Sequence, residues 1–433
     1  MLLAIPTMIN SLLQTMYNLT DTYWLGHVGS NELAAINLVS PVQNIIINFG
    51  SGITVAGSVL VAQYIGAKAP LKAKKMGEQI LVSSTLFAII CAIICVLATP
   101  ALITWLGASD EVFSNAKTYL QLVMLDMPLL FIVNVYTAMN QAQGDTVNPM
   151  KLNLIGTVLN IFLDPLFMAV FKWGTAGAAL ATVLAKVPLA IIAMISLIKP
   201  RDGIALSLKG FRFDKNELHK IVTVGLPSAL GSSAMWFGFL LMSKNVFVYG
   251  TEAMAAYGIG NKCNGLITLP ITGIGSAVST IVGQNMGAGQ TERAREGYLK
   301  SRNFGIIFLA VAGFILSRPP VAEAMVGIFT EDAGVRALAA DFLAVMAFWC
   351  WTNSFYNCTM GLFRGTGYTN VTMVIEATRL WIFRFLSLFI CERIFHMGVR
   401  SVWYCVVISN GISSVILHIL YKMGFWTNSR LKD

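Results

Sequence analysis

The chain has 433 residues, of which 56% are hydrophobic and only 12% charged, and its mean hydropathy is +0.69. Soluble proteins carry about 25% charged residues, so this composition excludes a soluble enzyme, a disordered chain and a small disulfide scaffold. The net charge of +9 is interpreted as a membrane-topology signal, and no nucleic-acid partner is expected.

Apolar segments separated by short polar breaks run along the whole chain. A membrane-spanning helix needs about 20 apolar residues, and the runs are continuous, unlike the alternating strands of a membrane barrel. We therefore predict an all-α polytopic membrane protein whose twelve transmembrane helices lie approximately at 1–25, 33–66, 76–106, 115–141, 147–171, 174–199, 219–249, 254–287, 303–327, 335–363, 370–392 and 399–425.

The loops differ in their content of Lys and Arg. If the N-terminus is cytoplasmic, nineteen of these residues lie on the cytoplasmic side and six on the outer side. The positive-inside rule then predicts a multi-pass protein of the cell (plasma or inner) membrane with both termini in the cytoplasm. The first segment has no charged leader and no cleavage site, so no cleavable signal peptide is expected, and a truncated cytoplasmic start stays open.

The two halves of the chain are related. When the first half is laid on the second with Pro6 on Pro227, glutamine and glycine positions also match without a gap, as with Gln63 and Gln284, and Gly144 and Gly365. We predict a six-helix lobe over 1–199, a charged cytoplasmic linker over 200–218 and a second six-helix lobe over 219–433. Parallel repeats of this kind are typical of transporters that work by alternating access.

Several motifs stand at fixed positions in both halves. They are P-x14-D from Pro6 to Asp21, YNLTDTYWLGHVGSNELAA (17–35), VAQYIGA (61–67), QAQGDTVNP (141–149), LNIFLDPLF (159–167), VGLPSAL (224–230), VGQNMGAG (282–289) and GLFRGTGYT (361–369). Over essentially its whole length the chain resembles the multidrug and toxic compound extrusion (MATE) family, and its first half resembles the DinF-like branch. The resemblance implies a V-shaped, monomeric, non-enzymatic antiporter without a cofactor, which expels organic and often cationic compounds in exchange for protons or sodium ions.

The acidic residues within the predicted spans of the first half include Asp21 in the first span and Asp164 in the fifth. An ionised carboxylate is costly in a bilayer, so each should face a cavity or a partner; the alternative interpretation is a helix cap or a structural hydrogen bond. The resemblance implies that Asp21, Asn160, Asp164 and Thr182 line a cation-coupling site. Such a set can exchange a proton or hold sodium, and the sequence does not choose between the two ions.

The second half does not repeat these acids. In the ungapped register Asp21 matches Met242, and the other three site residues match Trp381, Phe385 and Trp403, if that register holds so far along the chain. We therefore predict a coupling site in the first lobe alone. By the same resemblance, Pro6 is expected to let the first helix bend, because proline removes one backbone hydrogen bond.

Other polar and aromatic residues in the spans are candidates for a substrate cavity. They are Gln14, Tyr17, Asp126, Tyr136, Met139, Lys244 and Glu376. Glu376 and Arg379 stand three residues apart, so an ion pair between them is the simplest interpretation of both. Lys244 and Arg384 would repel cations from a cavity, which leaves anionic substrates open and keeps a flippase of lipid-linked precursors, from the same superfamily, as the alternative function.

Neither nucleotide hydrolysis nor enzyme chemistry is indicated. The phosphate-binding pattern G-x-x-x-x-G-K-[ST], the zinc pattern H-E-x-x-H and the nucleophile elbow G-x-S-x-G are all absent from the sequence. The seven cysteines and four histidines show no metal-ligand spacing. We expect small organic molecules and the lipid bilayer as the only partners.

Overall fold

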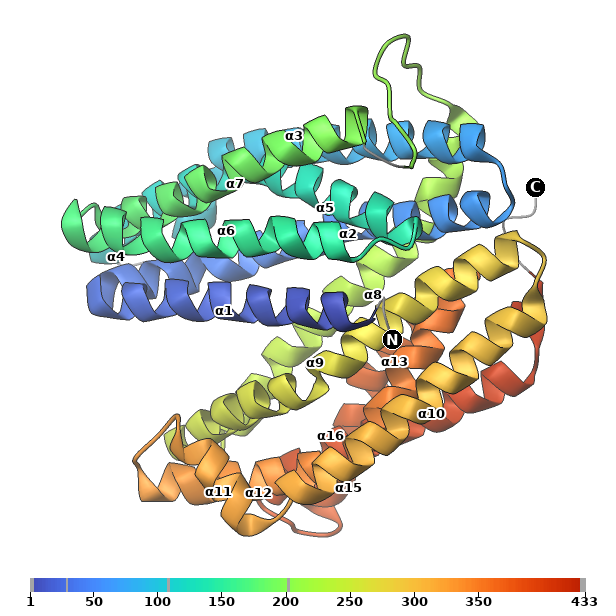
Figure 1. Ribbon diagram of the computed structural model, residues 1–433. Coiled ribbons are helices and arrows are strands. Elements are labelled where there is room, and N and C mark those ends of the chain that lie inside the picture. The colour runs from blue at the N-terminus through green and yellow to red at the C-terminus, as the bar shows by residue number, and fades with distance from the viewer. Residues whose placement is uncertain (1–3, 29, 107–109, 201–202, 429–433) are drawn as a thin grey trace. The chain divides into compact units, whose positions relative to one another are not determined.

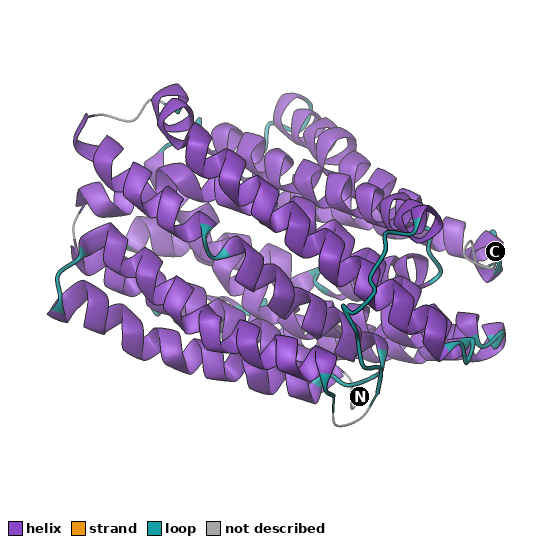
Figure 2. Cartoon of the chain, turned by 90° about the horizontal axis from the view of Figure 1, so that it is seen from above, coloured by secondary structure: helices purple, strands orange, loops and turns teal. Residues whose placement is uncertain are grey.

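The computed structural model describes residues 4–28, 30–106, 110–200 and 203–428, and it leaves out some side chains within helices, that of Asp21 among them. The described residues form helices joined by short loops and contain no strand (Figures 1 and 2). The predicted all-α membrane fold is confirmed. Within the described residues, eight helices are long and apolar enough to span a membrane, or up to ten if each of two bent helix pairs is counted as one span.

The first half contains seven α-helices and one π-helical segment. Their bounds are α1 Ala4–Val28, α2 Ser30–Gly66, α3 Pro70–Trp105, α4 Asp110–Met124, α5 Met127–Ala142, α6 Val147–Pro165, η1 Leu166–Val170 and α7 Gly174–Ile198.

The second half contains nine α-helices, a π-helical segment and a final 3-10 turn. Their bounds are α8 Lys215–Phe247, α9 Thr251–Gly287, α10 Thr291–Leu316, α11 Pro319–Gly327, α12 Ala333–Phe348, α13 Trp351–Gly365, α14 Thr369–Thr378, η2 Arg379–Arg384, α15 Phe385–Arg393, α16 Arg400–Lys422 and η3 Phe425–Thr427. With α1 and the unbroken run from α14 through η2 to α15, the spans are consistent with the predicted twelve.

The starts of the second and third helices of each half follow the repeat. α2 and α9 begin at Ser30 and Thr251, and α3 and α10 begin at Pro70 and Thr291, which is the same spacing that separates Pro6 from Pro227. The fourth span is bent in both halves, by 42° between α4 and α5 and by 56° between α12 and α13. The break therefore recurs in both halves, and α2 and α9 have the same length of 37 residues.

Beyond that break the ungapped register is wrong. α6 and α14 begin at Val147 and Thr369, and α7 and α16 begin at Gly174 and Arg400, so matching helices stand progressively farther apart than the first helices do. From these starts Asp164 matches Leu386 instead of Phe385, and Thr182 matches Ile408 instead of Trp403. The loop before α16, residues 394–399, is longer than the loop before α7, residues 171–173, and accounts for most of the drift between these two helix pairs. The corrected matches are still apolar, so the acid of α6 has no counterpart.

The chain packs into two compact units, one from Ile9 to Ala229 and one from Leu230 onward together with the residues up to Met8. The division falls inside α8. The predicted lobes, by contrast, meet in the loop that precedes this helix. The first turns of α8 therefore pack with the first unit.

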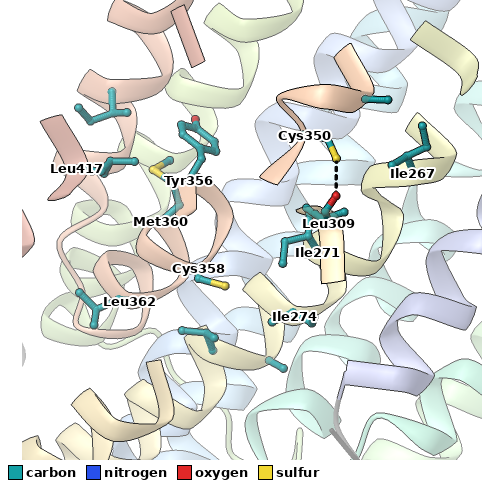
Figure 3. Packing of buried hydrophobic residues seen from close by; sticks show 14 of the residues in the cluster. Ile267, Ile271, Ile274, Leu309, Cys350, Tyr356, Cys358, Met360, Leu362 and Leu417 are labelled. Atoms are coloured by element: carbon teal, nitrogen blue, oxygen red, sulfur yellow. Dashed lines mark hydrogen bonds between the residues drawn. The ribbon is translucent and has the colours of Figure 1, made fainter. Parts of the chain in front are cut away.

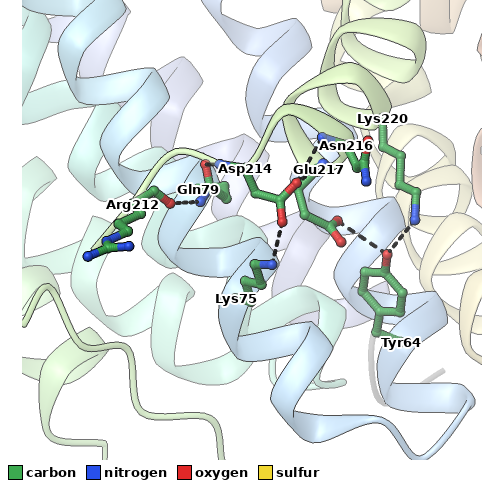
Figure 4. A network of polar contacts seen from close by, with 8 residues as sticks. All are labelled: Tyr64, Lys75, Gln79, Arg212, Asp214, Asn216, Glu217 and Lys220. Carbon is green, nitrogen blue, oxygen red and sulfur yellow. Dashed lines mark hydrogen bonds and ion pairs between the residues drawn. The ribbon is translucent and has the colours of Figure 1, made fainter. Parts of the chain in front are cut away.

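The loop before α8 is fastened to α3 (Figure 4). Gln79 donates a hydrogen bond to the carbonyl oxygen of Arg212 at 2.7 Å, and Lys75 forms an ion pair with Asp214. Asp214 also caps α8, because its carboxylate accepts from the backbone N–H of Asn216 at 2.8 Å. Lys75 and the backbone donors hold the pKa of Asp214 below its usual value.

A second set of contacts ties α8 to the end of α2 (Figure 4). Lys220 donates to the hydroxyl oxygen of Tyr64 at 3.1 Å, and that hydroxyl donates to Glu217 at 3.3 Å. The end of the loop and the first turns of α8 thus attach to α2 and α3 of the first unit, which shortens the free part of the predicted linker.

The core of the second unit lies where α9, α10, α13 and α16 meet (Figure 3). Ile271, Leu309, Cys358 and Leu417 are almost wholly buried there, and Cys350 donates its thiol hydrogen to the carbonyl oxygen of Leu309 at 3.2 Å. All seven cysteines are free. They therefore act as small packing residues, with no disulfide framework.

Several pairs of helices approach so closely that only glycine fits at the crossing, among them α2 with α8 and α9 with α13. A Cβ atom on Gly52 in α2 would stand 2.4 Å from the carbonyl oxygen of Gly225 in α8, and one on Gly361 in α13 would stand 2.3 Å from that of Gly275 in α9. Small residues at such crossings allow backbone-to-backbone packing between membrane helices.

We expect Gly361→Ala to destabilise the protein by about 1–3 kcal/mol, because the obstructing atom is a backbone oxygen that cannot turn away. Thermal unfolding of the purified protein in detergent measures this loss. Gly258→Ala is the matched control, since Gly258 lies within α9 with no described atom near its missing Cβ. That control should leave stability unchanged or raise it by about 1 kcal/mol. Equal melting temperatures for the two variants would contradict the close approach.

Candidate functional site in the buried polar residues of each unit

The polar pair Asn160 and Asp164 lies in the interior of the first unit. Both residues stand on α6 and both are fully buried. Asn160 donates from Nδ2 to Asp164 Oδ1 at 2.9 Å, as their spacing of one helical turn predicts. Asn160 Oδ1 has no hydrogen-bond partner among the described residues. A carboxylate and an unused amide oxygen thus lie within one turn of each other.

Local helix geometry holds this pair in place. Pro165 ends α6, and the next turn, Leu166–Val170, is π-helical. Because proline has no N–H, the regular hydrogen-bond ladder is interrupted directly after Asp164. π-helical turns are frequent at functional sites.

Thr182 lies on the neighbouring helix α7, which packs against α6, and it is nearly buried. Asp21 belongs to α1, but its side chain lies outside the described residues. The structure therefore brings together Asn160 and Asp164 from the predicted coupling site. The grouping of all four residues stays a prediction.

The surroundings of Asp126 differ from those expected for an acidic residue that faces an open cavity. It is fully buried at the bend between α4 and α5, and it forms an ion pair with Lys186 of α7. Lys186 follows Thr182 by one helical turn. The two partners are far apart in the chain. The sequence therefore places both charges within predicted spans but does not indicate that they form an ion pair.

The remaining cavity candidates occupy varied surroundings. Tyr136 and Met139 are buried on α5, and Met139 fills the space beside Gly77 as a packing residue. Tyr17 is half-buried on α1, and Pro6 is buried at the start of that helix. Gln14 and Lys244 are exposed. A shared cavity for this set stays a prediction.

In the second unit the predicted pair of Glu376 with Arg379 is wrong. Glu376 instead accepts from Arg364 of α13 at 2.6 Å, and this contact joins α13 to α14. This ion pair spans the turn between α13 and α14, so Glu376 is neutralised by a residue of the preceding helix and not by Arg379 of η2. Arg379 and Arg384 are left buried without a carboxylate partner among the described residues. Sequence reasoning paired Arg379 with Glu376 and placed Arg384 at a cavity, but it did not bring the two arginines together.

Comparisons with known proteins identify the family. The MatE family model matches residues 6–166 and again residues 227–390. The two matches begin at Pro6 and Pro227, the pair that the repeat aligns. The chain therefore belongs to the MatE family and is a membrane transporter, not an enzyme.

Individual relatives agree with this assignment. The probable multidrug resistance protein NorM of Thermotoga maritima is 28% identical over 455 aligned positions, which cover 100% of this chain and 94% of the relative. A solved outward-facing multidrug resistance MATE family transporter of the MOP superfamily superimposes with a TM-score of 0.91, at 26% identity, over 98% of this chain and 94% of its own. Membership of the DinF-like branch stays a prediction.

A second solved structure comes from Pyrococcus furiosus. This MOP superfamily transporter superimposes with a TM-score of 0.90, at 26% identity, over 98% of this chain and 94% of its own. It is described as having a binding pocket of reversed polarity that suggests a different function. Pocket polarity thus differs among proteins with this fold.

Proposed function

We propose that this protein is a secondary active antiporter that exports organic compounds in exchange for protons or sodium ions by alternating access. The observation that carries the proposal is the buried pair of Asn160 and Asp164, whose amide oxygen has no partner among the described residues, in a helix of a membrane transporter. Intramembrane carboxylates of transporters mark ion and proton pathways.

Both coupling ions fit these atoms chemically. Asp164 can take up and release a proton, and protonation removes the charge whose burial is costly. The same carboxylate, the free oxygen of Asn160 and the hydroxyl of Thr182 are the oxygen ligands that a hard cation such as sodium prefers. We place Asp21 in this site as the second carboxylate, with Pro6 as the point where α1 bends.

The remaining parts of the proposal concern the oligomeric state, the location in the cell and the different roles of the two lobes. The protein works as a monomer in the cell membrane, with both termini in the cytoplasm. Organic substrates cross it without a cofactor, and the first lobe holds the coupling ion while the second does not. Its two lobes correspond to residues 1–199 and 219–433.

Dye efflux from proteoliposomes tests the coupling. The purified protein is reconstituted with rhodamine 6G inside, and a pH gradient or a sodium gradient is imposed separately. We expect efflux to follow one of the two gradients and to stop when a matching ionophore collapses it. Efflux that ignores both gradients would contradict antiport.

The flippase alternative is favoured by one observation, the buried arginines Arg379 and Arg384 of the second unit. A lipid-linked diphosphate would supply negative charge to neutralise them. Translocation of a fluorescent lipid-linked diphosphate in the same proteoliposomes, combined with no dye efflux under either gradient, would decide for this function.

A further inference from the structure

Two guanidinium groups in the second unit have no anionic partner in the part of the chain that the structure describes. Arg379 and Arg384 are 8% and 2% exposed, and no described carboxylate lies within ion-pair distance of either. The nearest candidate in sequence, Glu376, is already neutralised by Arg364 at 2.6 Å. The interior of this unit therefore carries positive charge in excess, which is costly at membrane depth.

The π-helical segment η2 brings the two arginines together. In an α-helix, residues five apart point about 140° away from each other. In a π-helix the hydrogen bonds join residues five apart, so these residues stack on one face. Arg379 and Arg384 are the first and last residues of η2, and both donate to Asn410 Oδ1 of α16, each at 3.4 Å.

The remaining contacts of the two groups are weak and neutral. Arg379 donates to the sulfur of Met235 at 3.4 Å, and Arg384 donates to the hydroxyl of Ser409 at 3.2 Å. Arg379 Nε and Arg384 Nη1 are buried with no hydrogen-bond partner in the described chain. A buried charged donor without an acceptor is strongly unfavourable, so these nitrogens are suited to an incoming anion.

Aromatic rings flank the charges. The guanidinium carbon of Arg379 stands 4.3 Å from the ring centre of Tyr356, and that of Arg384 stands 5.7 Å from the ring of Phe239. The buried hydroxyl of Tyr356 also has no hydrogen-bond partner among the residues described. The rings fix the planes of the guanidinium groups and offer an apolar surface to an organic body.

We propose that Arg379 and Arg384 form a binding site for the phosphate or carboxylate group of an organic anion. Guanidinium groups bind both kinds of oxyanion through paired hydrogen bonds, and the hydroxyl of Tyr356 supplies a further donor. The ligand enters from the side of Arg379, the more exposed of the two. The inference rests on the proposed transport function only where it treats this anion as a transported substrate. The contacts that define the binding site do not depend on that function.

Binding to the intact protein in nanodiscs of phosphatidylcholine tests the site without any gradient. The probe is 1-naphthyl phosphate, and neutral 1-naphthol is its matched control. We expect the phosphate to bind more tightly than the naphthol, and Arg379→Gln or Arg384→Gln to weaken it by about tenfold or more. Arg393→Gln, an exposed arginine on the adjoining helix α15, should leave the affinity unchanged.

Three results would overturn the site: equal binding of phosphate and naphthol, equal affinity in all the variants, or loss of affinity in Arg393→Gln as well. If the glutamine variants fail to fold, Arg384→Lys serves instead. It keeps the charge but loses the paired donors, and it should bind the phosphate several-fold more weakly than the native protein. Unchanged affinity in that variant would contradict the paired hydrogen bonds.

A second experiment distinguishes a lipid headgroup from a soluble anion as the natural ligand of this site. Nanodiscs containing phosphatidic acid should compete with 1-naphthyl phosphate if a lipid phosphate occupies the site, and should not compete if the ligand is soluble. Loss of dye efflux with phosphate binding intact would contradict the antiport proposal and support the anion-binding site. Coupled efflux without phosphate binding would do the reverse.

Discussion

Asp164→Asn is expected to reduce ion-driven efflux to the level of protein-free vesicles while the protein stays folded. The substituted amide has nearly the same shape and keeps an oxygen to accept from Asn160 Nδ2, a hydrogen bond of 2.9 Å in the structure. It cannot release a proton, and it offers no negative charge to a sodium ion. The measurement is dye efflux from proteoliposomes under the gradient that drives the native protein, with unfolding followed in parallel.

The matched control is Asp145→Asn in the turn before α6. Asp145 precedes the N-cap residue Thr146; one of its oxygens accepts from the backbone N–H groups of Val147 at 3.0 Å and Asn148 at 3.1 Å, and the other accepts from Asn148 Nδ2. Asparagine keeps one oxygen for the two backbone N–H groups and loses only the exposed contact with Asn148 Nδ2, so efflux should stay at the native level and stability should fall by at most about 1 kcal/mol. Full efflux in Asp164→Asn would remove Asp164 from the coupling site, and loss of efflux in both variants would point to the stability of α6 instead.

Local patterns were enough to predict the all-α fold, the repeat and the pairing of Asn160 with Asp164. Hydropathy marks a membrane helix because no backbone polar group is left unsatisfied in it, and a spacing of four residues places two side chains on one face whatever packs around them. The predicted span 254–287 ends where α9 ends, whereas the predicted start at 303 misses the first, polar turns of α10, which begins at Thr291. These features depend on short stretches of chain.

Features that depend on distant residues could not be predicted in this way. Asp126 forms an ion pair with Lys186, although two helix connections separate them in the chain. Glu376 forms its ion pair with Arg364 and not with Arg379, across the turn that joins α13 to α14. The π-helical turn of η2 has no propensity signal, although it decides that Arg379 and Arg384 share one face. A helical wheel with α-helical spacing separates these two residues and hides the charge cluster.

The two clusters also suggest how the lobes of one repeat take on different tasks. The interior of the first unit holds Asp164 with the paired Asp126 and Lys186, and the interior of the second holds Arg379 and Arg384 with the paired Arg364 and Glu376. Each unit thus contains one compensated ion pair beside groups of a single sign. Since opposite charges favour opposite ligands, a cation site in one lobe and an anion site in the other is the arrangement that these residues favour.

Lys186→Met is expected to cost about 3–5 kcal/mol of stability, because it leaves the fully buried carboxylate of Asp126 without its counter-charge. The double variant Asp126→Asn with Lys186→Met removes both charges at similar volume, and it should recover most of that loss. Thermal unfolding of the single and double variants forms the cycle that isolates the interaction of the two residues.

Transport by the double variant separates a structural pair from a coupling pair. Asp126 stands at the 42° bend of the fourth span, and Lys186 holds that bend against α7, one turn from Thr182. If the pair only fixes this geometry, the double variant should retain at least about half of the native efflux, since neutral packing can replace a compensated ion pair. A stable double variant without efflux would show that the charges of Asp126 and Lys186 take part in coupling, and a Lys186→Met protein as stable as the native one would show that the carboxylate reaches water or another partner.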